Sequence, residues 1–323
     1  MLTLNDALTG LRARADAIRA ELHKVVIGQD EALTWLMLAV FLRGHVLLEG
    51  VPGTAKTLAV KTLARTIHAT FRRIQFTPDL MPSDITGVHI FDLTRSVFTL
   101  RKGPIFTDLL LADEINRTPA KTQAALLEAM QERCVTIDGE PHKLPDIFTV
   151  FATQNPIEME GTYPLPEAQT DRFLFKVTLG YPAPLEEEGI LKEYNAGREP
   201  HDVEKSGVQA VMTAEDAVMV RKTIDAVKVT DALITYIRKV VSATREASDV
   251  LLGCGPRAGI HLLMASKGLA AMEGRGFILP DDVKRAAAPV MRHRLILNPE
   301  AEVEGLKAES VIDRILAKVE VPR

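Results

Sequence analysis

The chain has 323 residues, 46% of them hydrophobic and 25% charged, which is enough apolar material for two folded domains and excludes a disordered or fibrous protein. Its 39 basic and 43 acidic residues give a net charge of −4, which argues against a general binder of nucleic acid or of anionic membranes. The two cysteines are far apart, the N-terminus has no apolar leader, and the longest apolar run covers only residues 35–42. We therefore expect a cytoplasmic protein without a disulfide framework or a membrane span.

Two helices are predicted before the first strand. Apolar residues recur every three or four positions from Leu4 to Leu22, as in an amphipathic helix, and residues 31–42 are apolar nearly all round, as in a buried one. Ile27, Gly28 and Gln29 break the pattern between them. This segment is either a turn before a helix or, beside a nucleotide site, the backbone edge that holds an adenine base; the residues alone leave both interpretations open.

A short apolar strand, Val46–Leu48, is followed at once by a glycine-containing loop and a helical pattern, the context in which a phosphate-binding loop is credible. Gly50 and Gly53 let the backbone approach a phosphate chain closely. Loop N–H groups and the helix N-terminus would hold the anion. Lys56 is placed to reach the β- and γ-phosphates and Thr57 to hold Mg²⁺. The predicted nucleotide-binding stretch comprises Gly50, Val51, Pro52, Gly53, Thr54, Ala55, Lys56, Thr57 and Leu58.

The loop departs from the common pattern at one position, because Ala55 stands where glycine usually precedes the lysine. Alanine needs little extra room, so the difference matters only if position 55 requires a positive φ. The simpler explanation of the stretch is a tight turn that closes an ordinary strand–helix unit. The strand, the Lys-Thr pair and the helix all in their expected places favour the phosphate loop instead.

A second apolar strand, 109–112, ends in Asp113 and Glu114. In a parallel α/β sheet, the carboxyl ends of the strands face the ligand crevice. Asp113 is placed to hold Mg²⁺, directly or through water, and Glu114 to orient and polarise the water that attacks the γ-phosphate. Alone, the pair would be better explained as a solvated turn; the upstream loop makes the catalytic interpretation the stronger one.

Two hairpins are predicted inside the α/β core, one over residues 88–100 and one over 135–144, the second with Asp-Gly near its turn. Between them, Thr118 and Pro119 predict a helix start with a hydroxyl N-cap and proline at the first helical position. The next strand, 148–155, ends in Asn155. This residue is either a ligand of the γ-phosphate or attacking water, or a turn former before proline.

The composition changes near residue 180. Residues 1–182 form the predicted α/β core, 183–207 are rich in proline, glycine and glutamate and form a predicted linker with a short helix, and 208–323 read as helical throughout. Thr213 with Asp216 resembles a capping box.

Four motifs taken together resemble the MoxR family of AAA+ ATPases, and the resemblance covers nearly the whole chain. They are Gly-Val-Pro-Gly-Thr-Ala-Lys-Thr at 50–57, Ala-Asp-Glu-Ile-Asn-Arg at 112–117, Leu-Leu-Glu-Ala-Met-Gln-Glu at 126–132 and Ala-Thr-Gln-Asn-Pro at 152–156. The resemblance implies an α/β fold: an AAA+ P-loop core with a five-stranded parallel sheet in an αβα sandwich, and a C-terminal all-helical lid domain. It also implies ATP and Mg²⁺ as cofactors.

The same resemblance implies roles for individual residues. Asn155 matches the sensor-1 residue, Arg257 the sensor-2 arginine of the lid, and Arg172 the arginine finger that reaches the nucleotide of a neighbouring subunit; from the residues alone, Arg172 beside Asp171 could be a surface ion pair. Residues 27–29 match the adenine-side segment. The two hairpins match the helix-2 insert and the pre-sensor hairpin. Gly255 stands where the family usually has serine, which leaves the helix of Arg257 without a hydroxyl cap.

The resemblance also implies a function: ATP hydrolysis in a homo-oligomeric ring, expected to be a hexamer, that remodels a client protein in a chaperone-like manner. The client is often a protein with a von Willebrand A domain, or a metalloenzyme. Two alternatives stay open. A DNA-acting or chelatase-type motor would share the hairpins, but the acidic net charge makes nucleic acid an unexpected partner. A scaffold with a fixed nucleotide would not need the intact Glu114.

Overall fold

The computed structural model describes residues 3–51, 53–154, 162–197, 203 and 205–322. Two predicted site residues, Pro52 and Asn155, lie outside the described residues. The chain divides into two compact units, each described by itself. The α/β unit comprises Ala17–Arg172 and Val177–Val218, and the helical unit comprises Met1–Asp16, Phe173–Lys176 and Met219–Arg323.

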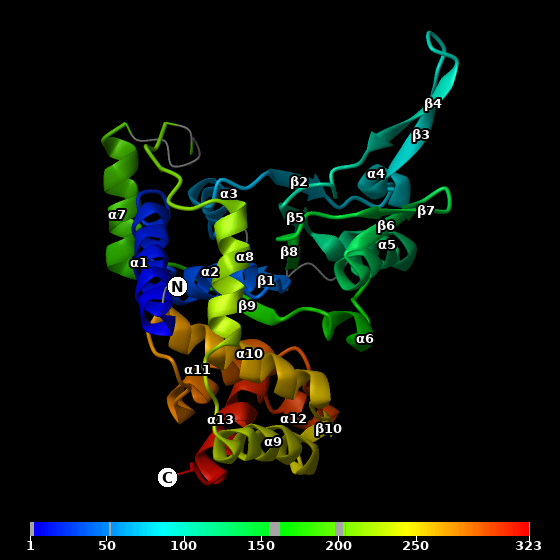
Figure 1. Cartoon of the computed structure of the whole chain (residues 1–323). Helices are drawn as coiled ribbons and strands as arrows, with labels where there is room; N and C mark the ends of the chain where they lie inside the picture. The colour runs from blue at the N-terminus through cyan, green and yellow to red at the C-terminus, as the bar shows by residue number, and fades with distance from the viewer. Residues whose placement is uncertain (1–2, 52, 155–161, 198–202, 204, 323) are drawn as a thin grey trace. The chain divides into compact units, whose positions relative to one another are not determined.

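A five-stranded sheet in the order β2-β5-β8-β1-β9 forms the centre of the fold (Figure 1). The pairs β2–β5, β5–β8 and β1–β8 are parallel, which confirms the predicted core. Because β8 lies between β1 and β5, the strand before the phosphate loop and the strand before Asp113 both pair with it. The strands are β1 (Val46–Gly50), β2 (Phe71–Gln75), β5 (Leu109–Asp113), β8 (Thr149–Gln154) and β9 (Phe175–Leu179).

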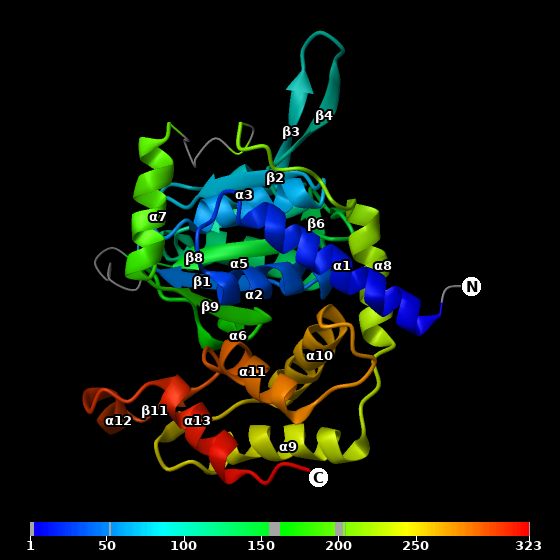
Figure 2. The same cartoon turned by 90° about the vertical axis from the view of Figure 1, so that its left-hand side faces the viewer.

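Helices cover both faces of this sheet. Figures 1 and 2 show α2 (Asp30–Phe41) and α3 (Lys56–Thr66) against one face and α5 (Ala120–Glu132) on the other. Residues 32–41 of α2 are all buried, as its apolar sequence predicts. The remaining helices of this unit are α4 (Pro82–Thr86), the 3₁₀ turn η1 (Ile115–Arg117), α6 (Glu167–Thr170) and α7 (Pro184–Asn195). Two helices, α1 (Leu4–Leu22) and α8 (Ala214–Asp225), have residues in both units.

Both predicted hairpins are present. Strands β3 (Gly87–Asp92) and β4 (Val97–Lys102) pair antiparallel and project from the α/β unit (Figures 1 and 2). Strands β6 (Cys134–Ile137) and β7 (Glu140–Lys143) pair across Asp138 and Gly139. Both turn residues have positive φ, 51° and 87°, as the favoured two-residue hairpin turn requires.

One predicted helix cap is wrong and one is confirmed. The Thr118 hydroxyl donates to the carbonyl of Ile115 instead of capping α5, whose N-cap is Pro119. The 3₁₀ turn before α5 leaves a carbonyl within reach of this side chain, and the hydroxyl satisfies it. At α8, the Thr213 N–H donates to Asp216 and the Asp216 N–H donates to the Thr213 hydroxyl, so the capping box forms.

The helical unit contains α9 (Asp231–Glu246), α10 (Pro256–Met272), α11 (Pro280–Met291), α12 (Pro299–Val303) and α13 (Ala308–Lys318). It is not entirely helical, because β10 (Val250–Leu252) and β11 (Ile296–Leu297) pair antiparallel. Runs this short carry no readable periodicity, which is why the sequence pattern missed them. In the described part of the chain, no helix combines the length and apolarity needed to cross a membrane.

The predicted linker, 183–207, contains the whole of α7, and its residues group with the α/β unit in the division above. The boundaries 1–182, 183–207 and 208–323 stay a prediction.

Candidate nucleotide-binding site

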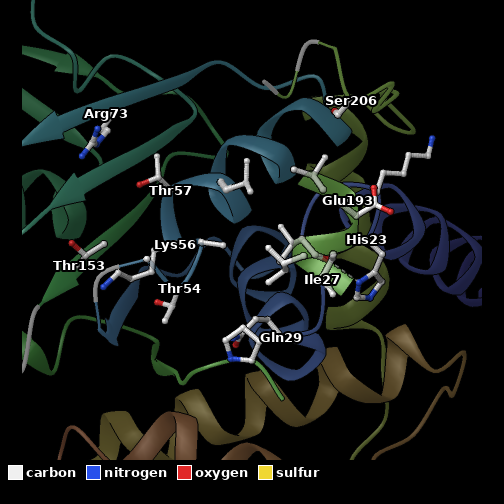
Figure 3. A pocket seen from close by; sticks show the side chains of 18 of the residues that line it. His23, Ile27, Gln29, Thr54, Lys56, Thr57, Arg73, Thr153, Glu193 and Ser206 are labelled. Atoms are coloured by element: carbon white, nitrogen blue, oxygen red, sulfur yellow. Dashed lines mark hydrogen bonds between the residues drawn. The ribbon is translucent and has the colours of Figure 1, made fainter. Parts of the chain in front are cut away.

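A cavity of about 1220 Å³ opens in the α/β unit. Figure 3 shows its labelled side chains in two groups, with Lys56, Thr57 and Arg73 toward one end and His23 and Ile27 toward the other. Most of the predicted cofactor and metal residues line it, together with the predicted catalytic residue Glu114: Ile27, Gln29, Gly53, Thr54, Ala55, Lys56, Thr57, Leu58 and Asp113. The structure therefore brings together residues from the phosphate loop, from the end of β5 and from the segment before α2.

The phosphate loop depends on close backbone packing at its start. A Cβ at Gly50 would lie 2.4 Å from the carbonyl oxygen of Leu179, so no larger residue fits there without a backbone shift. Lys56 Nζ donates to the carbonyl oxygens of Gly50 (2.6 Å) and Val51 (3.4 Å). Burial lowers the pKa of Lys56, and the carboxylates of Asp113 and Glu114 oppose that shift. The Lys56 ammonium group thus lies inside the phosphate loop, where it is predicted to bind phosphate.

Ala55 adopts the left-handed conformation, with φ 60° and ψ 20°, at the N-cap of α3. The φ of residue 55 is therefore positive, which is the condition under which alanine in place of glycine matters. An L-residue with a Cβ is strained there, whereas glycine is not. Ala55 therefore holds a backbone conformation that glycine would adopt at lower cost.

At the end of β5, Asp113 is held from both sides. Its Oδ2 accepts hydrogen bonds from Arg73 Nη2 (2.5 Å) and Arg73 Nε (3.0 Å), and its Oδ1 accepts one from the Thr153 hydroxyl (2.6 Å). Arg73 lies on β2 and Thr153 on β8, the two strands that flank β5. These contacts fix the orientation of the Asp113 carboxylate.

Glu114 is held in a similar way. Its Oε2 accepts a hydrogen bond from Gln75 Nε2 (2.7 Å) and lies 3.1 Å from Arg117 Nε. Its N–H donates to the Thr153 hydroxyl at 2.8 Å, and its backbone has φ 57°. The left-handed turn directs the chain away from the strand immediately after Asp113, so the two adjacent carboxylates have different hydrogen-bond partners.

Sequence reasoning missed Arg73, Gln75 and Thr153. A usable signal existed, because polar residues at the carboxyl end of a parallel strand face the crevice. The rule that points to the end of β5 and to Asn155 covers the end of β2 equally. Arg73 and Gln75 are two residues apart and therefore share one face of the strand.

The donor set fits magnesium. The Thr57 hydroxyl and the Asp113 carboxylate line the same cavity, and Mg²⁺ is usually held by one or two such protein oxygens together with phosphate oxygens and water. Within the described residues, no group of three or more His, Cys, Asp or Glu side chains gathers as a metal cage would require.

The segment before α2 is packed against α7. Gly28 has φ 69°, and a Cβ there would lie 2.4 Å from the Glu186 carboxylate. Gln29 Nε2 donates to the carbonyl of Gly180 at 3.0 Å. Ile190 and Glu193 of α7 also line the cavity. Part of the predicted linker is thus a wall of the site.

Arg172 and Arg257, two further predicted site residues, are not among the residues that line this cavity. Arg172 lines a separate cavity of about 240 Å³ with residues of α5 and Gln169, and its Nη1 donates to the Leu127 carbonyl at 2.8 Å. Arg257 is exposed on α10 in the helical unit, so its role stays a prediction. Asn155 is not among the described residues.

The parallel sheet with β8 between β1 and β5, the loop ahead of α3 and the Asp-Glu pair at the end of β5 are the architecture of an AAA+ ATPase core. Two family models match the chain. That of the ATPase family associated with various cellular activities (AAA) matches residues 45–175, and that of the AAA lid domain matches residues 242–315.

Individual relatives cover nearly the whole chain. Chaperone MoxR1 of Mycobacterium tuberculosis is 44% identical over 312 residues, which are 94% of this chain and 81% of the relative. The uncharacterized protein YeaC of Bacillus subtilis is 44% identical over 93% of this chain and 92% of its own. The crystal structure of a candidate ATPase from Cytophaga hutchinsonii superposes with a TM-score of 0.90 at 41% identity, over 98% of each chain. The chain belongs to the MoxR family of AAA+ ATPases.

Proposed function

We propose that this protein hydrolyses ATP with Mg²⁺ in the cavity described above. The observation that carries the proposal is the convergence, in one cavity, of Lys56 and Thr57 from the loop with Asp113 and Glu114 from β5. Phosphoryl transfer to water requires a cation that binds the phosphates, oxygen atoms that hold the metal, and a carboxylate that orients the water. These four residues supply all three.

Each group has a distinct task. Loop N–H groups and Lys56 bind the β- and γ-phosphates, Thr57 and Asp113 hold the metal, and Glu114 orients the attacking water and takes its proton. Mg²⁺, when bound, neutralises charge on the phosphates. The hydrogen bond from Gln75 and the nearby Arg117 support the position of the Glu114 carboxylate. Asn155 and Arg257 act as sensors of the γ-phosphate, and residues 27–29 bind the adenine.

The working form is a ring of identical subunits, expected to be a hexamer, in which Arg172 completes the site of the neighbouring subunit. In support, Arg172 lines a cavity other than the one that contains Lys56 and Asp113 of its own chain. It is already ordered by the Leu127 carbonyl. An arginine supplied in this way is worth about 10³–10⁵ in turnover.

The ring uses hydrolysis to remodel a client protein, such as one with a von Willebrand A domain or a metalloenzyme. The name of the relative Chaperone MoxR1 supports a chaperone-like role. The hairpin β3–β4 supports a protein client, because it exposes Phe91, Leu93 and Phe98, side chains suited to an apolar contact. The alternative, a DNA-acting or chelatase-type motor, would instead show binding to DNA that falls steeply with salt.

The test is ATP turnover against protein concentration for the wild type, Glu114→Gln and Arg172→Ala. We expect wild-type turnover per subunit to rise with concentration as rings form, and both variants to lose about 1,000-fold or more. The exposed Arg238→Ala on α9 is the matched control and should retain turnover. A strictly monomeric protein that hydrolyses ATP briskly, or an Arg172→Ala protein with normal turnover, would contradict the proposal.

The client is identified with Glu114→Gln, which should bind ATP without hydrolysing it and so retain a partner. We expect this variant to retain one or a few proteins in ATP but not in ADP. Retention of DNA instead would support the alternative motor.

A further inference from the structure

The carbonyl of Phe173, the residue after Arg172, is bound by residues of the helical unit. The carbonyl oxygen of Phe173 accepts hydrogen bonds from Arg294 Nη2 at 2.6 Å and from His293 Nε2 at 3.1 Å. Phe173 itself is buried, and residues 173–176 belong to the helical unit. The bond between Arg172 and Phe173 is therefore one of the places where the chain passes from one unit to the other.

Arg294 is a buried cation with several partners. Its side chain is 6% exposed, and besides Phe173 it donates to the carbonyl of Val290 and to His261 Nδ1, the latter at 2.7 Å. A buried guanidinium is tolerated only where its hydrogen bonds are satisfied, so these contacts fix its orientation. His293 adds a neutral donor, because burial and then the nearby Arg294 charge keep its pKa well below the usual range.

His261 ties this cluster to α10. It lies four residues after Arg257 on the same helix, so the two side chains emerge on neighbouring positions of one face. A chain of hydrogen bonds thus runs from α10, through His261 and Arg294, to the carbonyl of Phe173, the residue after Arg172.

We propose that Arg294 is a positioning residue for Arg172. It binds the Phe173 carbonyl to the lid, so that a shift of α10 within one subunit changes the position of Arg172, which enters the nucleotide site of the neighbouring subunit. Arg172 is held in the α/β unit by its hydrogen bond to Leu127, whereas Phe173 is held in the helical unit by Arg294. A movement of the lid would therefore be transmitted to Arg172 through the bond between these two residues. The inference rests on the proposed function, in which Arg172 acts in trans.

The test mixes two kinds of subunit that are each inactive alone. A donor subunit carries Lys56→Ala, which removes its nucleotide site but keeps Arg172; an acceptor subunit carries Arg172→Ala, which keeps the nucleotide site. Turnover returns in mixed rings where a donor arginine faces an acceptor site. Arg294→Lys is then placed in the donor or in the acceptor, and kcat and KM for ATP are measured.

We expect Arg294→Lys in the donor to lower the restored kcat by about tenfold or more with KM unchanged, since small misplacements of a catalytic group have effects of this size. In the acceptor the loss should stay below about threefold. A merely structural role would lower turnover equally from either position. Equal losses, or a larger loss in the acceptor, would overturn the inference. Failure of the unmodified mixture to regain activity would instead refute the trans-acting Arg172 itself, and this inference with it.

Two further variants keep the test decisive if Arg294→Lys folds poorly. His261→Ala removes one partner of Arg294 and should reproduce the donor-specific loss at about threefold. Arg292→Lys is the matched control, because Arg292 is two residues away, pairs with Glu309 at 3.3 Å and donates to the Ala288 carbonyl; it should lower turnover in neither position.

Discussion

Ala55 has a left-handed backbone conformation, which glycine adopts more easily than alanine does. Ala55→Gly should therefore raise the free energy of unfolding by about 1 kcal/mol, the approximate penalty of that conformation for an L-residue. Urea denaturation of both proteins measures this. Ala13→Gly, at an exposed position inside α1, is the control and should lower the same quantity by about 1 kcal/mol. A loss of stability in Ala55→Gly would show that the strain is absent.

Arg73 and a magnesium ion would both bind the Asp113 carboxylate. Removing the arginine leaves the negative charge of Asp113 less neutralised, so Arg73→Ala should lower the Mg²⁺ concentration for half-maximal ATP turnover. Since Arg73 is half exposed, the change should be modest, about threefold. Arg72→Ala is the control, because Arg72 is exposed on the opposite face of β2. A rise in the Mg²⁺ requirement of Arg73→Ala would show that the arginine assists the metal.

At the scale of elements, α10 begins without a side-chain cap. Gly255 occupies its N-cap with an extended backbone, φ −81° and ψ 176°, and a Cβ there would meet nothing within 4 Å. Gly255→Ser should raise the free energy of unfolding of the helical unit by about 0.5–1 kcal/mol, because its hydroxyl can accept from the N–H of Arg257 or Ala258. Gly255→Ala separates the backbone effect from the hydrogen bond. If both variants were equally stable in urea, the hydroxyl would contribute nothing.

At the scale of the whole molecule, a buried histidine makes stability depend on pH. His45 donates from Nε2 to the Met130 carbonyl and accepts at Nδ1 from the Val150 N–H, so it joins the start of β1 to α5 and β8. Burial, reinforced by the nearby Arg133 charge, lowers the pKa of His45 to about 3. In the unfolded chain His45 binds a proton near pH 6.5, whereas in the folded chain it binds one only near pH 3. Stability is therefore lost as the pH falls between these values.

The expected slope from this one group is up to about 1.4 kcal/mol per pH unit. His45→Gln should reduce the slope of the free energy of unfolding by that amount between about pH 4 and pH 6, whatever its effect on absolute stability. An identical slope in wild type and His45→Gln would mean that the folded protein accepts the proton.

Much of the site was predictable because its main parts are contiguous. Gly50–Thr57 and Asp113–Glu114 each combine a strand, a turn and functional side chains within a few residues, and the two hairpins carry their own turn signals. Backbone conformation at single positions was not predictable in the same way. Thr118 had the right chemistry for a helix cap but bonded to Ile115, and the φ of Ala55 follows from how the loop meets α3.

The sequence by itself determined the fold class, the family and the residues predicted to meet phosphate and metal, because local periodicity and short motifs specify them. Only the tertiary structure decided which side chains from distant segments surround those residues. Arg73 lies 40 positions before Asp113 and Thr153 lies 40 positions after it, and both side chains meet the Asp113 carboxylate because the strand order places β2, β5 and β8 side by side. The same holds for α7 as a wall of the cavity and for Arg294 on the Phe173 carbonyl. Such contacts depend on packing between segments, which local patterns do not record.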